Sequence, residues 1–309
     1  MDWDSREINE LVRRALAEDV GAGDVTAMAT IPSGATAHAR IVAKAPLVCA
    51  GLPIVACVFH ALDASVVIEL LANDGDGVEK GRELARIHGG ARAVLTGERT
   101  ALNFLAHLSG VATLTHTFVE SLAGTNAKIR DTRKTTPGLR LLEKYAVRMG
   151  GGTNHRIGLY DAILLKENHI ALAGGVKAAL DQAHAYGSSQ MKPQETTAYE
   201  ATAGLSKGLA NGSLPIQIEV RDETELREAL GAGAESVLLD NMTTEEADVC
   251  VKLARSLRRD CVIEISGGIT LDNARAYAET GADYLSSGAL THSAPAADLS
   301  LLVDRIEEK

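Results

Sequence analysis

The C-terminal part of the chain is predicted to form an α/β fold built on a parallel sheet. Short apolar segments typical of buried strands alternate there with helical segments, at intervals of roughly 20–25 residues. Polar residues or glycines follow each apolar segment directly, where α/β barrels and open α/β sheets place their functional groups. The N-terminal third lacks this alternation, so a second, smaller α+β domain is predicted there.

Capping residues define the helices of the C-terminal part. Asp222 is followed three residues later by Glu225, and Thr243 by Glu246, which is the pattern of a helix N-terminus. The strands between such helices should pair in parallel through right-handed βαβ units. We expect them at residues 161–166, 216–220, 237–239, 262–265 and 284–286.

In the N-terminal third, strands are expected at residues 37–43 and 65–71, between glycine-rich turns. A long helix is predicted from Thr96 to about Leu122, and we expect it to bridge the two domains. Residues 187–215 are rich in Gly, Ser, Thr and Ala without a clear period, so they are expected to form a surface excursion.

The composition argues against several classes of protein. A net charge of −10 disfavours binding to nucleic acid or an anionic membrane, and 3% aromatic residues leave few platforms for stacking bases. Residues 45–62 are apolar but interrupted by Pro46, Pro53 and His60, so they are expected to be buried core. The acidic start shows no signal peptide. The cysteines lack metal-ligand spacing and are expected to be reduced thiols of a cytoplasmic protein: Cys49, Cys57, Cys250 and Cys261.

One segment departs from the acidic balance. Residues 131–170 carry seven Lys or Arg and four Asp or Glu. Arginine binds carboxylates and phosphates through two parallel hydrogen bonds, whereas lysine acts as a point charge. The segment therefore predicts a pocket for a small, multiply charged anion. Its candidate residues lie in polar turns or directly after a buried strand: Arg133, Lys134, His155, Arg156, Lys166 and His169.

Two carboxylates and two glycine turns complete the predicted site. Glu219 and Asp240 lie at the ends of neighbouring strands, where such a pair holds Mg²⁺, directly or through water, or binds sugar hydroxyls. The turns Ser266-Gly267-Gly268 and Ser287-Gly288-Ala289 precede helices and would let backbone N–H groups approach a phosphate. Together these residues suit a phosphorylated sugar and an acidic co-substrate, as in phosphoribosyl transfer.

Several segments closely resemble the quinolinate phosphoribosyltransferase family, also called nicotinate-nucleotide pyrophosphorylase (carboxylating). They are GERTALNFLAHLSGVAT, the whole of 131–170, IEV, LLDNM, EISGGI and DYLSSGALTHSAPAADLSL. The resemblance runs from about Thr96 to the end and, more loosely, over the N-terminal domain. It implies transfer of the phosphoribosyl group of phosphoribosyl pyrophosphate to quinolinate with decarboxylation, giving nicotinate mononucleotide, diphosphate and CO₂ in NAD synthesis, with Mg²⁺ as cofactor.

The resemblance also implies an architecture. An N-terminal α/β sandwich is expected over residues 1–108, joined by the C-terminal tail at about 294–309. An incomplete, TIM-like α/β barrel of the type II phosphoribosyltransferases is expected over 109–293, with the excursion 187–215 within it. A homodimer, or a larger assembly of dimers, is implied, in which the partner's N-terminal region completes each active site. The excursion is longer than is usual in the family.

The motif residues take roles from the same resemblance. Arg99 is expected to reach into the partner's site, while Arg133, His155 and Arg156 hold the quinolinate carboxylates. Thr132 is expected to bind substrate as well. Lys134, Lys166 and His169 are expected to serve the carboxylates and the diphosphate-bearing ribose. Glu219 and Asp240 are expected to hold ribose hydroxyls and Mg²⁺, and with Lys134 and Lys166 they form the expected catalytic set. The 5′-phosphate is expected among Ser266, Gly267, Gly268, Ser287, Gly288, Ala289 and His292.

Three alternatives stay open from the sequence. A related phosphoribosyltransferase of the molybdate-transport-associated type would use another acceptor. A Schiff-base aldolase would use Lys166, which ends a strand in a phosphate-binding barrel. A non-catalytic regulator would bind a phosphosugar without releasing diphosphate.

Overall fold

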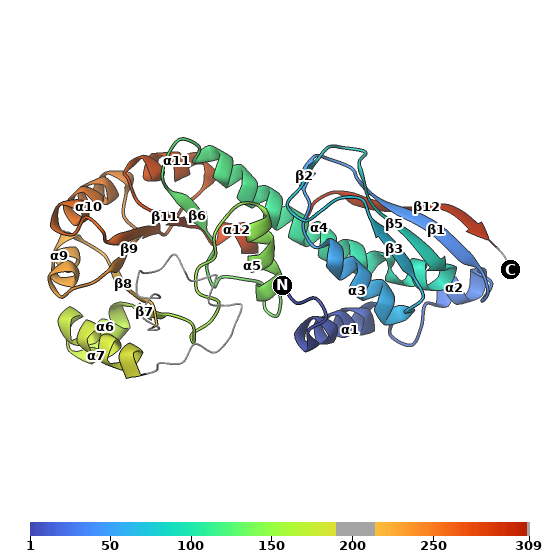
Figure 1. The fold of residues 1–309 in the computed structure, drawn as a ribbon, viewed down its shortest axis with the longest axis horizontal. Helices are drawn as coiled ribbons and strands as arrows, with labels where there is room; N and C mark the ends of the chain where they lie inside the picture. The colour runs from blue at the N-terminus through green and yellow to red at the C-terminus, as the bar shows by residue number, and fades with distance from the viewer. Residues whose placement is uncertain (190–213, 308–309) are drawn as a thin grey trace. The chain divides into compact units, whose positions relative to one another are not determined.

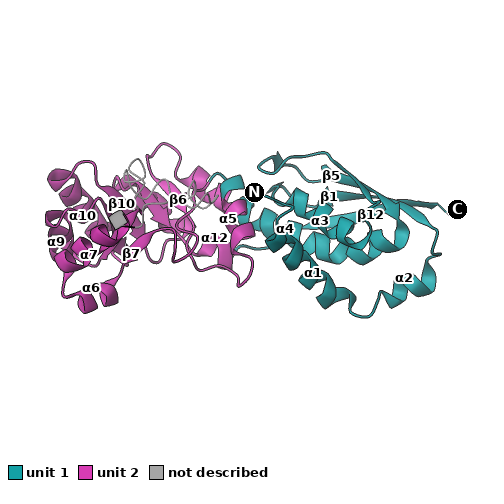
Figure 2. Ribbon diagram, turned by 60° about the horizontal axis from the view of Figure 1, so that its bottom comes forward, with its two compact units in different colours: residues 1–114, 148–151, 294–309 teal, residues 115–147, 152–293 magenta. Residues whose placement is uncertain are grey.

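The structure is a computed structural model that describes residues 1–189 and 214–307, in two compact units. Unit 1 comprises residues 1–114, 148–151 and 294–309, and unit 2 comprises 115–147 and 152–293 (Figure 2). Most of the predicted excursion, residues 190–213, lies outside the described residues. No helix of the described part is long and apolar enough to span a membrane.

Unit 1 contains an antiparallel sheet with the strand order β12-β1-β5-β3 (Figure 1). Strands β1 (Thr36–Ala43) and β3 (Val67–Leu70) confirm the two predicted strands, and they are joined by β5 (Glu83–Gly90) and β12 (Leu299–Glu307). A second, two-stranded sheet pairs β2 with β4. The remaining elements of the unit are β2 (Leu47–Val48), β4 (Gly77–Val78), α1 (Arg6–Val20), α2 (Val25–Thr30), α3 (Leu52–Leu62) and the start of α4 (Ala91–Ser121).

The apolar stretch 45–62 is buried core, as predicted. It forms β2 and then α3, with Pro53 in the first turn of that helix, where its missing N–H costs nothing. The predicted long helix is confirmed as α4, but it begins at Ala91 instead of Thr96. Ala91 and Val94 are fully buried, so tertiary packing extends the helix by more than a turn beyond the sequence signal.

Unit 2 contains a parallel six-stranded sheet with the order β6-β11-β10-β9-β8-β7, which confirms the predicted α/β class. Its strands are β6 (Lys128–Arg130), β7 (Ile163–Leu165), β8 (Ile216–Val220), β9 (Ser236–Asp240), β10 (Val262–Ser266) and β11 (Tyr284–Ser286). Its helices are α5 (Arg140–Met149), α6 (Glu167–Ala173), α7 (Val176–Ser189), α9 (Glu223–Gly231), α10 (Thr244–Leu257), α11 (Leu271–Glu279) and α12 (Ala289–His292) (Figure 1).

Both predicted capping motifs form. The Asp222 carboxylate accepts a hydrogen bond from the backbone N–H of Glu225 at 2.8 Å, and Thr243 and Glu246 exchange the two bonds of a capping box. Such caps stabilise a helix by about 1 kcal/mol each. They fix where the chain turns from strand to helix, and so leave Glu219 and Asp240 at the ends of their strands.

The parallel sheet curls into a barrel. Thr153 bridges to Arg130 on the outer side of β6, so the segment carrying His155 lies five strand positions from β8 in the sheet order. In a flat sheet that separation would be about 24 Å, at roughly 4.8 Å per strand. Instead, Nε2 of His155 lies 3.2 Å from Oε1 of Gln217 on β8. The strands must therefore wrap around a common interior.

We expect Gly110→Ala to destabilise unit 1. A Cβ atom at this position of α4 would lie 2.0 Å from the carbonyl oxygen of Pro295, in a segment that is hydrogen bonded to the same helix through Ala297. Overpacking against backbone costs about 1–3 kcal/mol, which should lower the thermal midpoint by several degrees. Gly231→Ala is the control, because the space around that glycine is open. Equal midpoints for the two variants would contradict this packing.

Candidate active site

The predicted site residues of unit 2 gather at the carboxyl ends of the parallel strands. The register pairs Ser266 with both Asp240 and Ser286, so the ends of β9, β10 and β11 are level. Lys166 directly follows β7, and Glu219 is the penultimate residue of β8. The strand order thus places the acidic, glycine and lysine candidates along one edge of the barrel.

A buried carboxylate organises the cationic side of this edge. Asp131 accepts hydrogen bonds from Nζ of Lys144 at 2.5 Å, from Nδ2 of Asn154 at 2.5 Å and from the backbone N–H of His155 at 2.8 Å. Burial raises the pKa of Asp131 and lowers that of Lys144, and the ion pair between them opposes both shifts. The contacts join the turn after β6 to the segment that carries Arg156.

The contacts of Asp131 bring Arg133 and Arg156 close enough for their charges to interact. Burial lowers the pKa of Arg156, and the charge of Arg133 adds to the effect. Nη1 of Arg156 donates to the carbonyl of Ala162 at 3.0 Å, but Nε of each arginine is buried without a partner among the described residues. A buried donor left unpaired costs about 1–3 kcal/mol, so both groups are prepared to bind an anion.

His155 directly precedes Arg156, and both nitrogens of its ring have partners within the protein. Nδ1 accepts the backbone N–H of Arg156 at 2.7 Å, and Nε2 faces Gln217. Thr132 lies in the same turn as Arg133, and its hydroxyl accepts the backbone N–H of Lys134 at 2.9 Å. The two residues therefore shape the main chain around the arginines.

Lys134, Gly288 and His292 converge at the start of α12. A Cβ atom at Gly288 would lie 2.9 Å from Nε2 of His292 and 3.0 Å from Cδ of Lys134. The Thr291 hydroxyl donates to the carbonyl of Lys134 at 2.9 Å, which holds the two segments together. Only glycine leaves open space between these two basic side chains, next to Ala289 at the first position of the helix.

The second glycine turn lies against the end of β9. A Cβ atom at Gly267 would lie 2.2 Å from Oδ1 of Asn241, whose Nδ2 donates to the Asp240 carboxylate at 2.8 Å. Gly267 and Gly268 have φ angles of 98° and 64°, which side chains disfavour. By contrast, the Ser287 hydroxyl is buried and donates to the carbonyl of Ile269, so it serves the turn itself.

Lys166 and Glu219 form an ion pair with 2.5 Å between Nζ and Oε2. The glutamate side chain is 9% exposed and the lysine side chain 48% exposed, so the pair lies at the rim of the barrel. Nδ1 of His169 accepts the backbone N–H of Lys166 and completes the N-terminus of α6. Arg99, the remaining predicted site residue, is exposed on α4 within unit 1.

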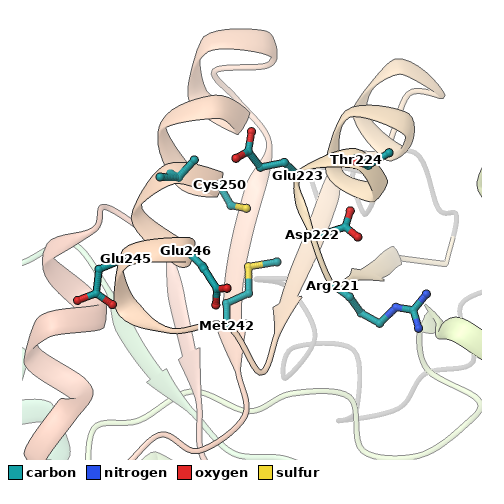
Figure 3. Close-up of a pocket in the computed structure, with 9 residues that line it drawn as sticks. Arg221, Asp222, Glu223, Thr224, Met242, Glu245, Glu246 and Cys250 are labelled. Atoms are coloured by element: carbon teal, nitrogen blue, oxygen red, sulfur yellow. The ribbon is translucent and has the colours of Figure 1, made fainter.

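A cavity of about 500 Å³ lies between the N-termini of α9 and α10. Figure 3 shows Glu223 and Cys250 facing one another across it, while Arg221 extends away. Four carboxylates line the cavity, so it is unsuited to phosphates or carboxylates. Burial raises the pKa of the Cys250 thiol to about 11, which makes it a poor nucleophile.

Sequence reasoning missed the polar residues inside the barrel. Arg130 and Glu264 form a buried ion pair at 2.9 Å, and the Arg130 guanidinium lies over the ring of Tyr284. Burial acts to raise the pKa of Glu264, but His155, Arg130 and hydrogen bonds from neighbours bring it below the ordinary value. The available signal was a charged residue in the middle of an apolar strand, as in the segment VIEI.

The fold and these strand ends define an α/β protein with cationic side chains and glycine turns at the carboxyl edge of a parallel barrel. Two family models match the chain: "Quinolinate phosphoribosyl transferase, N-terminal domain" over residues 24–109, and the C-terminal domain of the same family over 111–204 and 196–302. The chain therefore belongs to the quinolinate phosphoribosyl transferase family.

Curated relatives and solved structures agree with this assignment. The chain is 40% identical to a probable nicotinate-nucleotide pyrophosphorylase [carboxylating] of Bacillus subtilis, over 96% of this chain and 93% of the relative. It is also 40% identical to the Mycobacterium leprae protein of that name, over 94% and 95%. The structure of NadC from Streptococcus pyogenes superposes with a TM-score of 0.84 at 38% identity, over 99% of both chains. The nicotinate-nucleotide pyrophosphorylase of Francisella tularensis gives 0.84 at 37% identity, over 96% of both chains.

We expect His155 to make the stability of the fold depend on pH. Burial lowers its pKa from 6.5 to about 4; Glu264 opposes the shift, while Arg130, Lys144 and Arg156 support it. The unfolded chain therefore binds more protons between these values, and the free energy of unfolding falls as the pH drops through that window. The loss amounts to about 3 kcal/mol at most.

His155→Asn should remove this contribution, because an amide does not titrate and its oxygen can still accept the N–H of Arg156. Urea unfolding at about pH 7 and about pH 4.5 should show a smaller loss of stability for the variant than for the wild type, by on the order of 2 kcal/mol. Parallel losses in both proteins would show that His155 is not held neutral.

Proposed function

We propose that the protein transfers the phosphoribosyl group of phosphoribosyl pyrophosphate to quinolinate with loss of CO₂, giving nicotinate mononucleotide and diphosphate in NAD synthesis. The observation that carries this proposal is the pair of arginines, Arg133 and Arg156, each of which has a buried Nε donor without a partner among the described residues. Two adjacent cations match a pyridine that carries two adjacent carboxylates. The relatives named for this reaction support the assignment.

Phosphoribosyl pyrophosphate fits the part of the barrel edge that carries the two glycine turns. Lys134 and His292 are exposed beside Gly288, and Gly267 brings a second turn close to Asp240. We assign the 5′-phosphate to these glycine turns, including the main chain of Ser266, Gly268, Ser287 and Ala289. Lys166 and Glu219 lie between the two halves, where a ribose hydroxyl can bind the carboxylate and the diphosphate can bind the ammonium group.

The reaction then follows from charge. The pyridine nitrogen attacks C1 of the ribose as the C1–O bond to diphosphate breaks, and positive charge develops on the ribose. Preorganised cations at Lys134 and Lys166 stabilise the departing diphosphate. The bond between C2 and its carboxylate next breaks and CO₂ leaves; the electron pair stays at C2, where the positive charge of the adjacent alkylated nitrogen stabilises it, and a proton then binds at C2. The arginines hold the second carboxylate and keep the ring in place.

Mg²⁺ is compatible with these residues as a substrate-borne ion. The described residues contain no cluster of three or more His, Cys, Asp or Glu that could hold a metal. Mg²⁺ is commonly held by one or two carboxylates together with substrate phosphates and waters, so Asp240 and Glu219 suffice as protein ligands. When bound, the ion would neutralise charge on the diphosphate.

Two alternatives are less well supported. In a Schiff-base aldolase the lysine must act as a free amine, whereas Lys166 is ion-paired with Glu219. A phosphoribosyltransferase with a monoanionic acceptor would not need two arginines whose buried Nε donors lack a partner among the described residues. We further propose a cytoplasmic homodimer, or an assembly of dimers, in which exposed Arg99 reaches the partner's site.

Arg133→Ala should lower quinolinate turnover by roughly two orders of magnitude or more, because it removes a charged hydrogen bond donor from the carboxylate site. Formation of nicotinate mononucleotide from quinolinate, phosphoribosyl pyrophosphate and Mg²⁺ measures the effect. Arg227→Ala, on the exposed face of α9, is the matched control. Normal turnover by a folded Arg133→Ala protein would contradict the assignment of Arg133 to the quinolinate carboxylates.

The shared site can be tested by complementation. Arg99→Ala and Lys166→Ala chains should each be inactive alone, since each lacks a different part of the site. After mixing and reassembly, the sample should regain up to about a quarter of wild-type activity. Half of the dimers are then heterodimers, and one of the two sites in each heterodimer is intact. Absence of any rescue, with heterodimers demonstrated by mass spectrometry, would exclude a shared site.

A further inference from the structure

The interior of the barrel carries a polar layer where branched apolar side chains are usual. Glu264 on β10 is fully buried, and its carboxylate is contacted from three other strands. Oε2 accepts from Nη1 of Arg130 at 2.9 Å and from Nε2 of Gln217 at 3.0 Å, and Oε1 accepts from the hydroxyl of Ser286. A buried ion pair is seldom more stable than apolar packing of the same volume, so stability alone does not account for this layer.

The hydrogen bonds of this layer have one consistent direction. Both oxygens of the Glu264 carboxylate accept, so the group of Gln217 that faces them must be its NH₂. The carbonyl oxygen of Gln217 then faces Nε2 of His155 at 3.2 Å, and a carbonyl oxygen can only accept. Nε2 must therefore carry the proton, which leaves Nδ1 bare to accept the N–H of Arg156 at 2.7 Å.

Through this chain of bonds, a carboxylate at the centre of the barrel determines the main chain at Arg156. We propose that Glu264 and Gln217 are positioning residues for the quinolinate site: through the ring of His155 they fix the backbone that presents the Arg156 guanidinium to the substrate. His155 then contributes by orientation, because both of its ring nitrogens are engaged below the rim. This inference rests on the proposed function for its kinetic consequence, but not for its hydrogen bonds.

Gln217→Leu tests the relay most directly. It removes the hydrogen bond between Gln217 and Nε2 of His155, so that only the longer contact of 3.6 Å between Nε2 and Oε1 of Glu264 remains, and it leaves Glu264 paired with Arg130 and Ser286. With Arg156 less well placed, KM for quinolinate should rise roughly tenfold, while kcat at saturation and KM for phosphoribosyl pyrophosphate change by less than about threefold. Gln182→Leu, on the exposed surface of α7, is the matched control. A purely structural defect would instead reduce the amount of active enzyme and lower kcat at unchanged KM.

Two replacements of His155 separate orientation from direct binding. In His155→Asn the amide oxygen can take the place of Nδ1, whereas His155→Leu can accept no hydrogen bond from Arg156. The increase in KM for quinolinate should therefore be clearly smaller for Asn than for Leu. Equal increases would indicate that the ring itself binds the substrate, and would overturn the proposal.

A spectroscopic measurement tests the relay without the reaction. Long-range ¹H–¹⁵N spectra of histidine-labelled protein, with the His155 signals assigned by their loss in His155→Asn, report which ring nitrogen carries the proton. The wild type should show a protonated Nε2 and a bare Nδ1, and Gln217→Leu should show a mixture of tautomers. A protonated Nδ1 in the wild type would overturn the relay even if quinolinate turnover is found. Absence of turnover with the expected tautomer would instead count against the proposed function alone.

Discussion

The carboxylate of Asp131 is the group on which the geometry of the site depends. It binds Lys144 on α5 and the Asn154–His155 segment, so residues 23 and 24 positions away in the chain are held beside the turn that carries Arg133. The group is fully buried, and loss of either charge in the Asp131–Lys144 pair would leave the other unpaired in the interior. The Nε donors of the two arginines can remain unpaired because a satisfied ion pair sets the position of the segments that carry them.

The charges of the rim explain how an acidic protein can bind acidic substrates. Most ion pairs of the described residues lie on exposed surfaces, where they are worth little, whereas Arg133 and Arg156 form no ion pair with those residues. Lys166 differs, because it is ion-paired with Glu219, and under the proposed function a substrate competes for either group. Under the proposed function, the site therefore combines fixed positive charge for the carboxylates with a cation that can be released. Donors held in place before the substrate binds need no reorganisation as charge develops.

The sequence predicted best where local chemistry decides the structure. Five of the six described strands of unit 2 and the caps at Asp222 and Thr243 follow from apolar periodicity and from side chains that bond to nearby backbone, whereas the short strand β6 was not predicted. The start of α4 was missed because packing of Ala91 and Val94 extends the helix. The polar layer was missed for a different reason: its members come from four strands far apart in the chain, and only closure of the barrel brings them together.

Strand β8 carries one residue of the buried polar layer and one residue of the predicted site. Side chains two residues apart on a strand point to the same face, so Gln217 and Glu219 both face the barrel axis, one level apart. The upper residue holds Lys166 at the rim, and the lower one holds His155 beneath Arg156. A displacement of this single strand would thus disturb both the lysine assigned to the diphosphate and the arginine assigned to the acceptor. The two substrates must meet in line for the C1 atom to be attacked as diphosphate leaves, and one short strand positions a cation for each.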